Sequence, residues 1–347
     1  MARAKKPKKR ASGRGPKKPF AIDLHAHLIV PEVRAFAAKH LIPMTPPKGV
    51  RLNAAQLKRL AKWRAELDRR FSDTKTRVRE MDKAGVDIQV ITTSLVHQCT
   101  YWAAPTESLK MERLSNDRLA ETVAARPDRF IGLGGVPLGD TRKAVRELER
   151  CLGELGLKGV QISSMAGKRE LGDAKVDPFW KRAEELGALI TIHPAGLTEA
   201  RHQRYYLWNS VGQPLEEIMA MSSLIYEGVL EKFPKLNILV GHGGGYLPFY
   251  AGRHDRNYLE KPATTLNMTK SPSAYLRDFH YDTCVYNRDM LEFLVGKVGA
   301  GRIVLGSDYP AGEADPIGFV TRSRKISAAD KERILWRNAA KLLRISV

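Results

Sequence analysis

The 347-residue sequence has only three cysteines, Cys99, Cys151 and Cys284, which are widely separated and odd in number. Such a set is a poor basis for a disulfide framework, so we expect the chain to work in a reducing cytoplasm. The longest apolar runs, such as 236–240 and 303–305, have the length of strands. They fall far short of the roughly 20 residues that a membrane-spanning helix needs, and we therefore expect a soluble protein.

Acidic residues are absent from the first 20 positions, where nine residues are Lys or Arg. Because Gly, Pro and Ser separate these charges, the segment cannot form a core, and we expect a disordered basic tail over residues 1–20. It also lacks the apolar stretch of a secretory signal. The rest of the chain carries +11 of the formal charge of +20. We expect nonspecific contacts of the tail with polyanions, and a nucleic-acid-binding protein is the alternative from another function class.

Short β-branched runs alternate with segments of helical periodicity from residue 21 onward, a pattern typical of βα units around a parallel sheet. Eight runs have the composition of strands, at 21–25, 88–94, 130–136, 159–163, 189–193, 237–241, 279–284 and 302–306. They predict an α/β fold with one closed (β/α)8 TIM barrel over residues 21–347. The stretch 32–76 is too long for an ordinary βα loop, and we expect an insertion over the barrel mouth.

One intervening helix can be delimited from its sequence. Asp140 is a plausible N-cap, and Gly156 stands where a glycine commonly follows a helix. Four apolar residues between them share one face, Val145, Leu148, Leu152 and Leu155. Their spacing predicts a helix that packs against the barrel through this face.

Polar side chains stand at the C-terminal ends of the predicted strands, which in a TIM barrel meet at the catalytic face. His25 and His27 end the first strand two residues apart, so both point the same way. His193 ends the fifth strand, His242 the sixth and Asp308 the eighth. An isolated histidine in such a place is commonly satisfied by a carbonyl group. Together, however, three of these imidazoles and the carboxylate predict a site for Zn²⁺, with Mn²⁺ or Fe²⁺ as alternatives.

Further motifs accompany these residues in a fixed order: Arg79-Glu80-Met81-Asp82, Tyr101-Trp102-Ala103, Asn116-Asp117, the segment 231–236 and His242-Gly243-Gly244-Gly245. In order and spacing, residues 21–343 resemble the amidohydrolase-related family of the amidohydrolase superfamily that contains 2-amino-3-carboxymuconate-6-semialdehyde decarboxylase. The resemblance implies a set of metal ligands and a separate catalytic histidine. The implied ligands are His25, His27, His193 and Asp308, and the implied catalytic residue is His242.

The resemblance also implies an activity and an assembly. The activity is that of a metal-dependent, non-oxidative decarboxylase, a carbon-carbon lyase, that acts on an unsaturated or aromatic carboxylic acid. His242 would transfer the proton, with Asp308 beside it. Arg253 would grip the substrate carboxylate in the site of the neighbouring subunit, which implies a homodimer. A hydrolase or hydratase that acts on a lactone, an amide or an oxo acid is the alternative, because the same metal can activate water.

Two departures from the family pattern predict a different substrate. The second substrate arginine of the family has no clear counterpart within 32–76, where Arg51, Arg69 and Arg70 are candidates. Tyr286-Asn287 replaces a His-Asp pair on the seventh strand. We therefore expect a pocket with one ionisable group fewer near the mouth.

Overall fold

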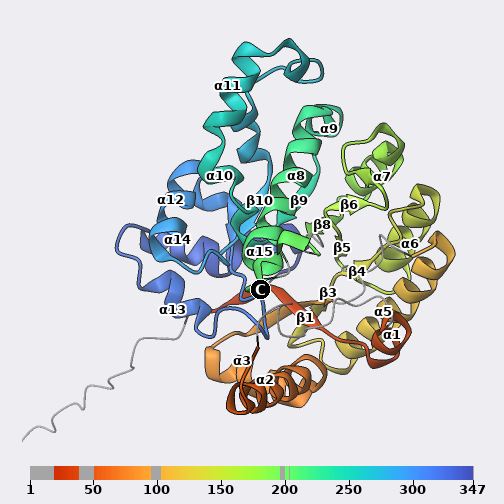
Figure 1. Ribbon diagram of the computed structural model, residues 1–347, viewed down its shortest axis with the longest axis vertical. Coiled ribbons are helices and arrows are strands. Elements are labelled where there is room, and N and C mark those ends of the chain that lie inside the picture. Colours follow the sequence, from red (N-terminus) through yellow and green to blue (C-terminus); the bar gives the residue numbers. More distant parts are fainter. Residues whose placement is uncertain (1–18, 39–50, 95–102, 196–199, 203, 347) are drawn as a thin grey trace, which may run out of the picture.

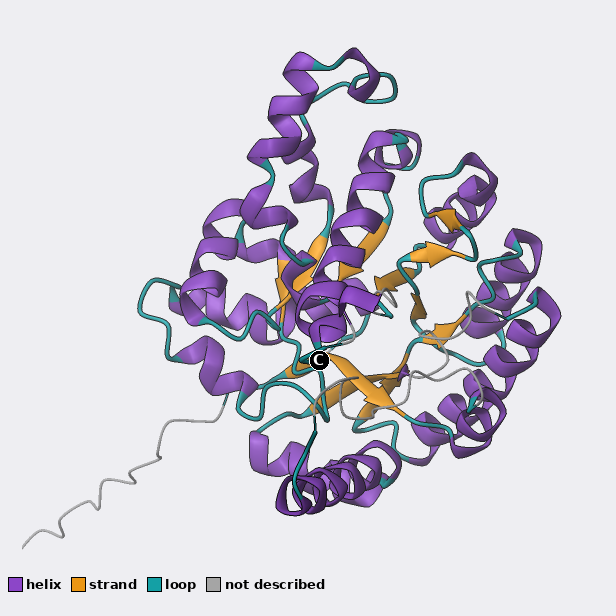
Figure 2. Cartoon of the chain, viewed as in Figure 1, coloured by secondary structure: helices purple, strands orange, loops and turns teal. Residues whose placement is uncertain are grey.

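The computed structural model describes residues 19–38, 51–94, 103–195, 200–202 and 204–346. Within these residues, parallel strands form a ring that helices surround (Figure 2). The strands of the ring are β1 (Ile22–Leu28), β2 (Ile88–Thr93), β3 (Phe130–Gly132) with β4 (Gly134–Gly135), β5 (Gly159–Ile162), β8 (Leu189–Ile192), β9 (Asn237–Val240), β10 (His280–Asp282) and β11 (Ile303–Val304). The predicted TIM barrel is confirmed, and β3 and β4 together form the strand that the sequence predicts over 130–136.

The ring closes between its first and last strands. The backbone N–H of Leu24 in β1 donates to the carbonyl of Leu305, which follows β11, at 2.8 Å. A parallel bridge joins Ala26 to Tyr309 on the same seam. The loop that carries Asp308 is therefore held directly against the histidine-bearing strand β1.

Helices surround the ring, and the last of them lies across one end of it (Figure 1). They are α1 (Pro31–Ala37), α2 (Ala54–Ser72), α3 (Thr74–Ala84), α5 (Pro105–Ala125), α6 (Thr141–Gly153), α7 (Asp177–Leu186), α8 (Gln213–Tyr226), α9 (Val229–Lys232), α10 (Leu247–Tyr250), α11 (Gly252–Glu260), α12 (Arg288–Val298), α13 (Pro316–Thr321), α14 (Ala328–Glu332) and α15 (Asn338–Leu343). A short antiparallel pair, β6 (Met165–Ala166) and β7 (Arg169–Glu170), lies beside the ring. None of the described helices combines the length and apolar character that crossing a bilayer requires.

The apolar core has two main layers, one inside the ring and one between the ring and its helices. Strand residues such as Leu24, Val90 and Leu239 fill the inside and pack against Ala339 and Leu343 of α15. This helix lies across the end of the ring where the strands begin (Figure 1). The opposite end, where the strands finish, is left for polar side chains.

Helix α6 confirms the prediction for the one helix that the sequence delimits. The Asp140 carboxylate caps it by accepting from the backbone N–H of Lys143 at 3.1 Å. Leu148 is fully buried, and Val145, Leu152 and Leu155 pack against the outer layer. The helix ends at Gly153, and Gly156 makes the turn into β5 with φ of 67°.

A β-bulge in β1 sets the direction of its histidines. Between Asp23 and Ala26 the register with β2 shifts by one residue. Strict alternation would place His25 on the face opposite to Leu24. Because the bulge adds one residue, Leu24 fills the ring and His25 and His27 still converge on its mouth.

The predicted insertion 32–76 is largely helical where it is described. Its longest element is α2, which begins with a capping box between Asn53 and Gln56. At its end, the Phe71 carbonyl accepts from the N–H of Ile29, and Arg70 donates to the carbonyl of Pro310 at 2.8 Å. The helix therefore ends against β1 and the loop after β11. Residues 39–50, and most of the predicted tail at 1–18, lie outside the described residues.

Candidate metal centre

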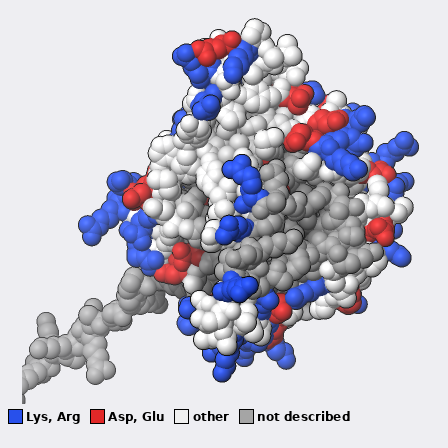
Figure 3. Space-filling model, in the orientation of Figure 1, with Lys and Arg blue, Asp and Glu red and all other residues white. Residues whose placement is uncertain are grey.

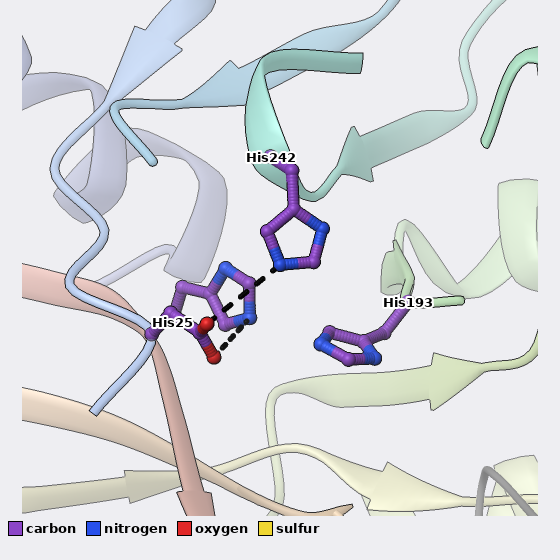
Figure 4. Close-up of side chains that lie close together, drawn as sticks. His25, His193 and His242 are labelled. Carbon is purple, nitrogen blue, oxygen red and sulfur yellow. Dashed lines mark ion pairs between the residues drawn. The ribbon is translucent and has the colours of Figure 1, made fainter. Parts of the chain in front are cut away.

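Five predicted polar residues meet at the end of the ring where the strands finish. His25, His193, His242 and Asp308 each present one ligand atom, and these four atoms lie within 4.8 Å of one another. Figure 4 shows the three labelled imidazoles directed toward a shared space. His27 joins them, since its Nε2 lies 3.0 Å from Nε2 of His25 and 3.2 Å from Oδ1 of Asp308. Residues that are distant in sequence therefore form one cluster.

Asp282, at the end of β10, fixes the orientation of His25. Its Oδ2 lies 2.5 Å from Nδ1 of His25 and accepts the backbone N–H of His242 at 3.1 Å, while Oδ1 accepts that of Gly243 at 3.0 Å. With Nδ1 engaged in this way, Nε2 of His25 is free to bind a metal. Burial opposes protonation of His25, but the hydrogen bond and charge of Asp282 outweigh it and raise the pKa of the ring.

His27 and His193 have environments that favour the neutral imidazole. Nδ1 of His27 lies 3.0 Å from the Thr92 hydroxyl on β2, and burial lowers the pKa of His27 to about 4. Burial and the neighbouring imidazoles lower the pKa of His193 well below its usual value. Nε2 of His193 is buried and has no hydrogen-bond partner in the described part of the chain. An unpaired buried nitrogen is unfavourable unless something binds it, so the cluster fits a resident metal ion.

His242 is held by a carboxylate from α8. Its Nδ1 lies 2.6 Å from Oε1 of the buried Glu217, and its Nε2 points toward Oδ2 of Asp308 at 3.8 Å. Burial disfavours the charged ring, but the charges of Glu217 and Asp308 outweigh it and raise the pKa of His242 well above its usual value. Burial raises the pKa of Glu217 to about 7. Glu217 therefore holds the His242 ring with Nε2 directed toward the cluster.

The glycines after His242 are required by packing. A Cβ on Gly243 would lie 2.3 Å from Cγ1 of Val285, and one on Gly244 would lie 2.6 Å from the Tyr281 ring. Gly243 also has φ of 63°, which side chains rarely tolerate. These contacts indicate that the two glycines form a tight turn. His242 lies at the tip of this turn.

Asp308 faces the cluster with both carboxylate oxygens. Oδ1 lies 3.6 Å from Nε2 of His25 and 3.2 Å from Nε2 of His27, while Oδ2 lies toward His242. The backbone N–H of Asp308 donates to the carbonyl of His25 at 2.8 Å. Burial raises the pKa of the carboxyl, but the neighbouring imidazoles of His242, His27 and His25 outweigh it and lower the pKa well below its usual range. Asp308 therefore presents an ionised carboxylate to the cluster.

Backbone strain concentrates at the cluster. Of six non-glycine residues with positive φ in the described part of the chain, three lie here: His242 at 48°, Asp308 at 54° and Tyr286 at 52°. Such conformations persist where the surrounding structure imposes them, and they are frequent at functional sites. The strain therefore supports a functional role for the cluster.

A sequence model of the amidohydrolase family matches residues 22–345, which is nearly the whole described barrel. The chain belongs to this amidohydrolase family. It is 35% identical over 286 residues to a 2-amino-3-carboxymuconate-6-semialdehyde decarboxylase from Dictyostelium discoideum, a match that covers 81% of this chain and 79% of the relative.

Solved structures resemble this amidohydrolase over most of its length. A 5-carboxyvanillate decarboxylase from Sphingomonas paucimobilis is 27% identical, with a TM-score of 0.80 over 94% of this chain and 100% of that one. A dihydroxybenzoic acid decarboxylase from Polaromonas sp. JS666, solved with manganese and the inhibitor 2-nitroresorcinol, is 25% identical, with a TM-score of 0.75 over 94% and 97%. These structures share the barrel of this amidohydrolase.

Two residues of the amidohydrolase's centre are not among the sequence predictions. Asp282 lies near the end of a predicted strand, at 279–284, and is the last residue of β10, so the rule that selected the other residues could have found it. Glu217 lies within α8, and it is one of several acidic residues on helices. Its contact with His242 depends on how α8 packs against β9, which local sequence does not specify.

The candidate arginines of the amidohydrolase lie outside the cluster. Arg253 is exposed on α11, which projects from the barrel in Figure 1. Arg51 is exposed, Arg69 pairs with Glu66 at 2.7 Å, and Arg70 pairs with a glutamate of α3 at 2.8 Å. On the face in Figure 3, basic and acidic side chains are interspersed, which gives little support to the nucleic-acid alternative.

Replacing Glu217 with glutamine should lower the turnover of the amidohydrolase about 10- to 100-fold, as expected when the residue that orients a functional histidine is lost. The amide keeps the size of the side chain but removes the charge that faces Nδ1 of His242. Metal content per chain should stay the same, because Glu217 contacts His242 and none of the proposed ligands in the contacts described above. Steady-state kinetics together with elemental analysis checks both parts, and unchanged turnover would contradict the orienting role of Glu217.

Proposed function

We propose that this amidohydrolase is a metal-dependent, non-oxidative decarboxylase of an unsaturated or aromatic carboxylic acid. The observation that carries the proposal is the pairing of a compact ligand cluster with a separately oriented histidine at its edge. The names of the relatives support the same reaction class, since they act on 2-amino-3-carboxymuconate-6-semialdehyde, 5-carboxyvanillate and dihydroxybenzoic acid.

The proposed metal ligands are His25, His27, His193 and Asp308, with Zn²⁺ as the proposed ion and Mn²⁺ or Fe²⁺ as alternatives. Three neutral nitrogens and one carboxylate suit each of these ions. The manganese of the Polaromonas enzyme supports Mn²⁺ as the first alternative. A divalent ion bound here would polarise an oxygen of the substrate.

His242 is the proposed proton donor, and Glu217 and Asp308 hold it in place. Nε2 gives its proton to the unsaturated carbon that bears the carboxylate, and the π electrons of that carbon form the new C–H bond. The bond to the carboxylate then breaks, its electron pair restores the unsaturated system, and carbon dioxide leaves. His242 recovers a proton from solvent, so the net change replaces a carboxylate with hydrogen. Asp308 stabilises the charged imidazole through Oδ2.

Product analysis with a panel of hydroxybenzoates and carboxymuconates tests this reaction class. We expect carbon dioxide and the decarboxylated product to form in equal amounts, without a requirement for oxygen. Ring opening or addition of water without carbon dioxide would contradict the proposal and would identify a hydrolase or hydratase. Chelation of the metal should abolish either activity, so the identity of the product is the deciding observation.

We also propose a homodimer in which Arg253 reaches the substrate carboxylate in the neighbouring site. Exposed apolar side chains near Arg253 support a protein contact on this face, since Tyr250 is 62% exposed and Leu259 is 79% exposed. The guanidinium of Arg253 is itself exposed. An arginine fork binds a carboxylate with two parallel hydrogen bonds.

Mixing two inactive variants tests the shared site. In a hybrid of His242→Ala and Arg253→Ala chains, one of the two sites has both residues intact. With random exchange, about one quarter of the wild-type activity should therefore return. No activity despite verified hybrid dimers would contradict the shared site, and a monomer in solution would contradict the assembly.

The cytoplasm remains the proposed compartment, supported by the free buried thiols of Cys151 and Cys284.

A further inference from the structure

The phenol of Tyr286 contacts Asp308 from the open edge of the metal centre. Its hydroxyl donates to Oδ2 of Asp308 at 3.2 Å, the same oxygen that faces Nε2 of His242 at 3.8 Å. The side chain is 56% exposed, so the ring lies at the surface of the mouth. The two oxygens of Asp308 thus have different neighbours: Oδ1 faces the imidazoles of β1, and Oδ2 faces Tyr286 and His242.

The backbone on both sides of Tyr286 is anchored, which explains how its positive φ is maintained. On one side, the N–H of Val285 donates to the carbonyl of Thr283 at 2.8 Å, and Val285 packs against the outer core. On the other side, the Asn287 side chain caps α12 by accepting from the N–H of Asp289 at 2.9 Å. Since its neighbours are fixed, Tyr286 is directed toward Asp308 by the fold itself.

The loop after β11 leaves room for the phenol. A Cβ on Gly312 would lie 2.9 Å from the Tyr286 hydroxyl oxygen and 2.7 Å from Cβ of Asp308. The N–H of Gly312 donates to the carbonyl of Asp308 at 2.9 Å, which keeps this glycine against the ligand. Two segments therefore meet at the hydroxyl: the segment after β10, which carries Tyr286, and the loop after β11, which carries Asp308 and Gly312.

We propose that Tyr286 is a positioning residue for Asp308 and that its ring contacts the substrate. A carboxylate can turn about its last bond and offer both oxygens to a cation. A hydrogen bond to Oδ2 opposes this rotation, so Asp308 would offer a bound metal Oδ1 alone, and Oδ2 stays available to His242. The exposed ring then forms part of the wall against which a planar acid lies. The substrate part rests on the proposed decarboxylation, whereas the effect on Asp308 does not.

Two substitutions separate the hydroxyl from the ring. Tyr286→Phe removes the hydroxyl and keeps the ring, and Tyr286→Leu removes both. Tyr275→Phe is a matched control, because the Tyr275 hydroxyl donates to a carboxylate, that of Glu231, outside the metal centre. Each full-length chain is freed of metal, titrated with Co²⁺ alone, and followed by visible absorption, whose intensity falls when more ligand atoms surround the ion.

For Tyr286→Phe we expect one Co²⁺ per chain with weaker visible absorption, because Asp308 then binds through both oxygens. Turnover should fall about 10- to 100-fold, as for other residues that orient a ligand, with KM within about twofold. Tyr286→Leu should reproduce the spectrum of the Phe variant and raise KM as well. Tyr275→Phe should match the wild type in spectrum, turnover and KM.

Wild-type absorption and turnover in Tyr286→Phe would overturn the positioning role. An equal KM for the Phe and Leu variants would overturn the contact with the ring. If the wild type releases no carbon dioxide from any acid, the proposed decarboxylation fails, and the Co²⁺ spectra still decide whether Tyr286 positions Asp308. The two proposals can therefore fail separately.

Discussion

Replacing His242 with alanine should lower turnover by about 10²- to 10⁴-fold, the usual contribution of a positioned proton donor, while one metal ion per chain is retained. The ring has a partner at Nδ1 in Glu217, and its Nε2 is directed toward Asp308. The geometry alone also permits His242 as a ligand, since its nitrogen belongs to the set of four atoms within 4.8 Å. Metal content in this variant therefore separates the two roles.

His254→Ala provides the control for the metal measurement. This half-buried imidazole lies on α11, with Nε2 3.0 Å from the Ser222 hydroxyl and its ring stacked on Tyr226. It should bind as much metal as the wild type. If His242→Ala instead loses its metal while the control keeps it, His242 is a ligand and the proposed proton donor must be another residue.

Replacing His193 with alanine should remove the metal and nearly all turnover. His193 is buried, and its Nε2 has no hydrogen-bond partner in the described residues. A bound ion would satisfy this nitrogen. If the metal stabilises the transition state by several kcal/mol, its loss corresponds to a fall of roughly 10³-fold or more in rate. Excess metal should recover part of the activity, because the other ligands remain.

His193 is a better test than His25, whose removal would leave the buried carboxylate of Asp282 with backbone donors alone and so destabilise the barrel. Circular dichroism and thermal unfolding of metal-free His193→Ala should match those of the metal-free wild type. Elemental analysis then reports metal binding alone. Full metal content and normal turnover in a folded His193→Ala chain would contradict its role as a ligand.

The fold could be predicted because each strand carries its own signal. β-branched runs of four to eight residues recur at the spacing of βα units, and polar residues at their ends mark the catalytic face. The bulge in β1 has no comparable signal. Alternation alone would send Leu24 and His25 to opposite faces, and only the register with β2 shows how both point inward.

The residues of the cluster could be predicted as a group, although local chemistry does not show which of them would bind a metal. Four histidines and an aspartate converge, and residue type does not distinguish His27 from His242. The two histidines differ in the partner of Nδ1, which is the Thr92 hydroxyl for His27 and the Glu217 carboxylate for His242. These contacts join β1 to β2 and α8 to the turn after β9, so they arise only when the barrel is assembled.

The residues proposed to contact the substrate are the least predictable from the sequence, because they lie in loops. Tyr286 could be recognised as a departure from the family pattern, but its contact with Asp308 depends on a left-handed backbone. Loop geometry of this kind is set by anchors on both sides rather than by the residue itself.

Anomalous diffraction from crystals grown with Mn²⁺ measures the position of the ion directly. The account predicts a single strong peak within bonding distance of Nε2 of His25, Nε2 of His27, a ring nitrogen of His193 and Oδ1 of Asp308, with His242 nearby and unbound. A peak that His242 binds in place of His27, or the absence of a peak among these residues, would contradict it.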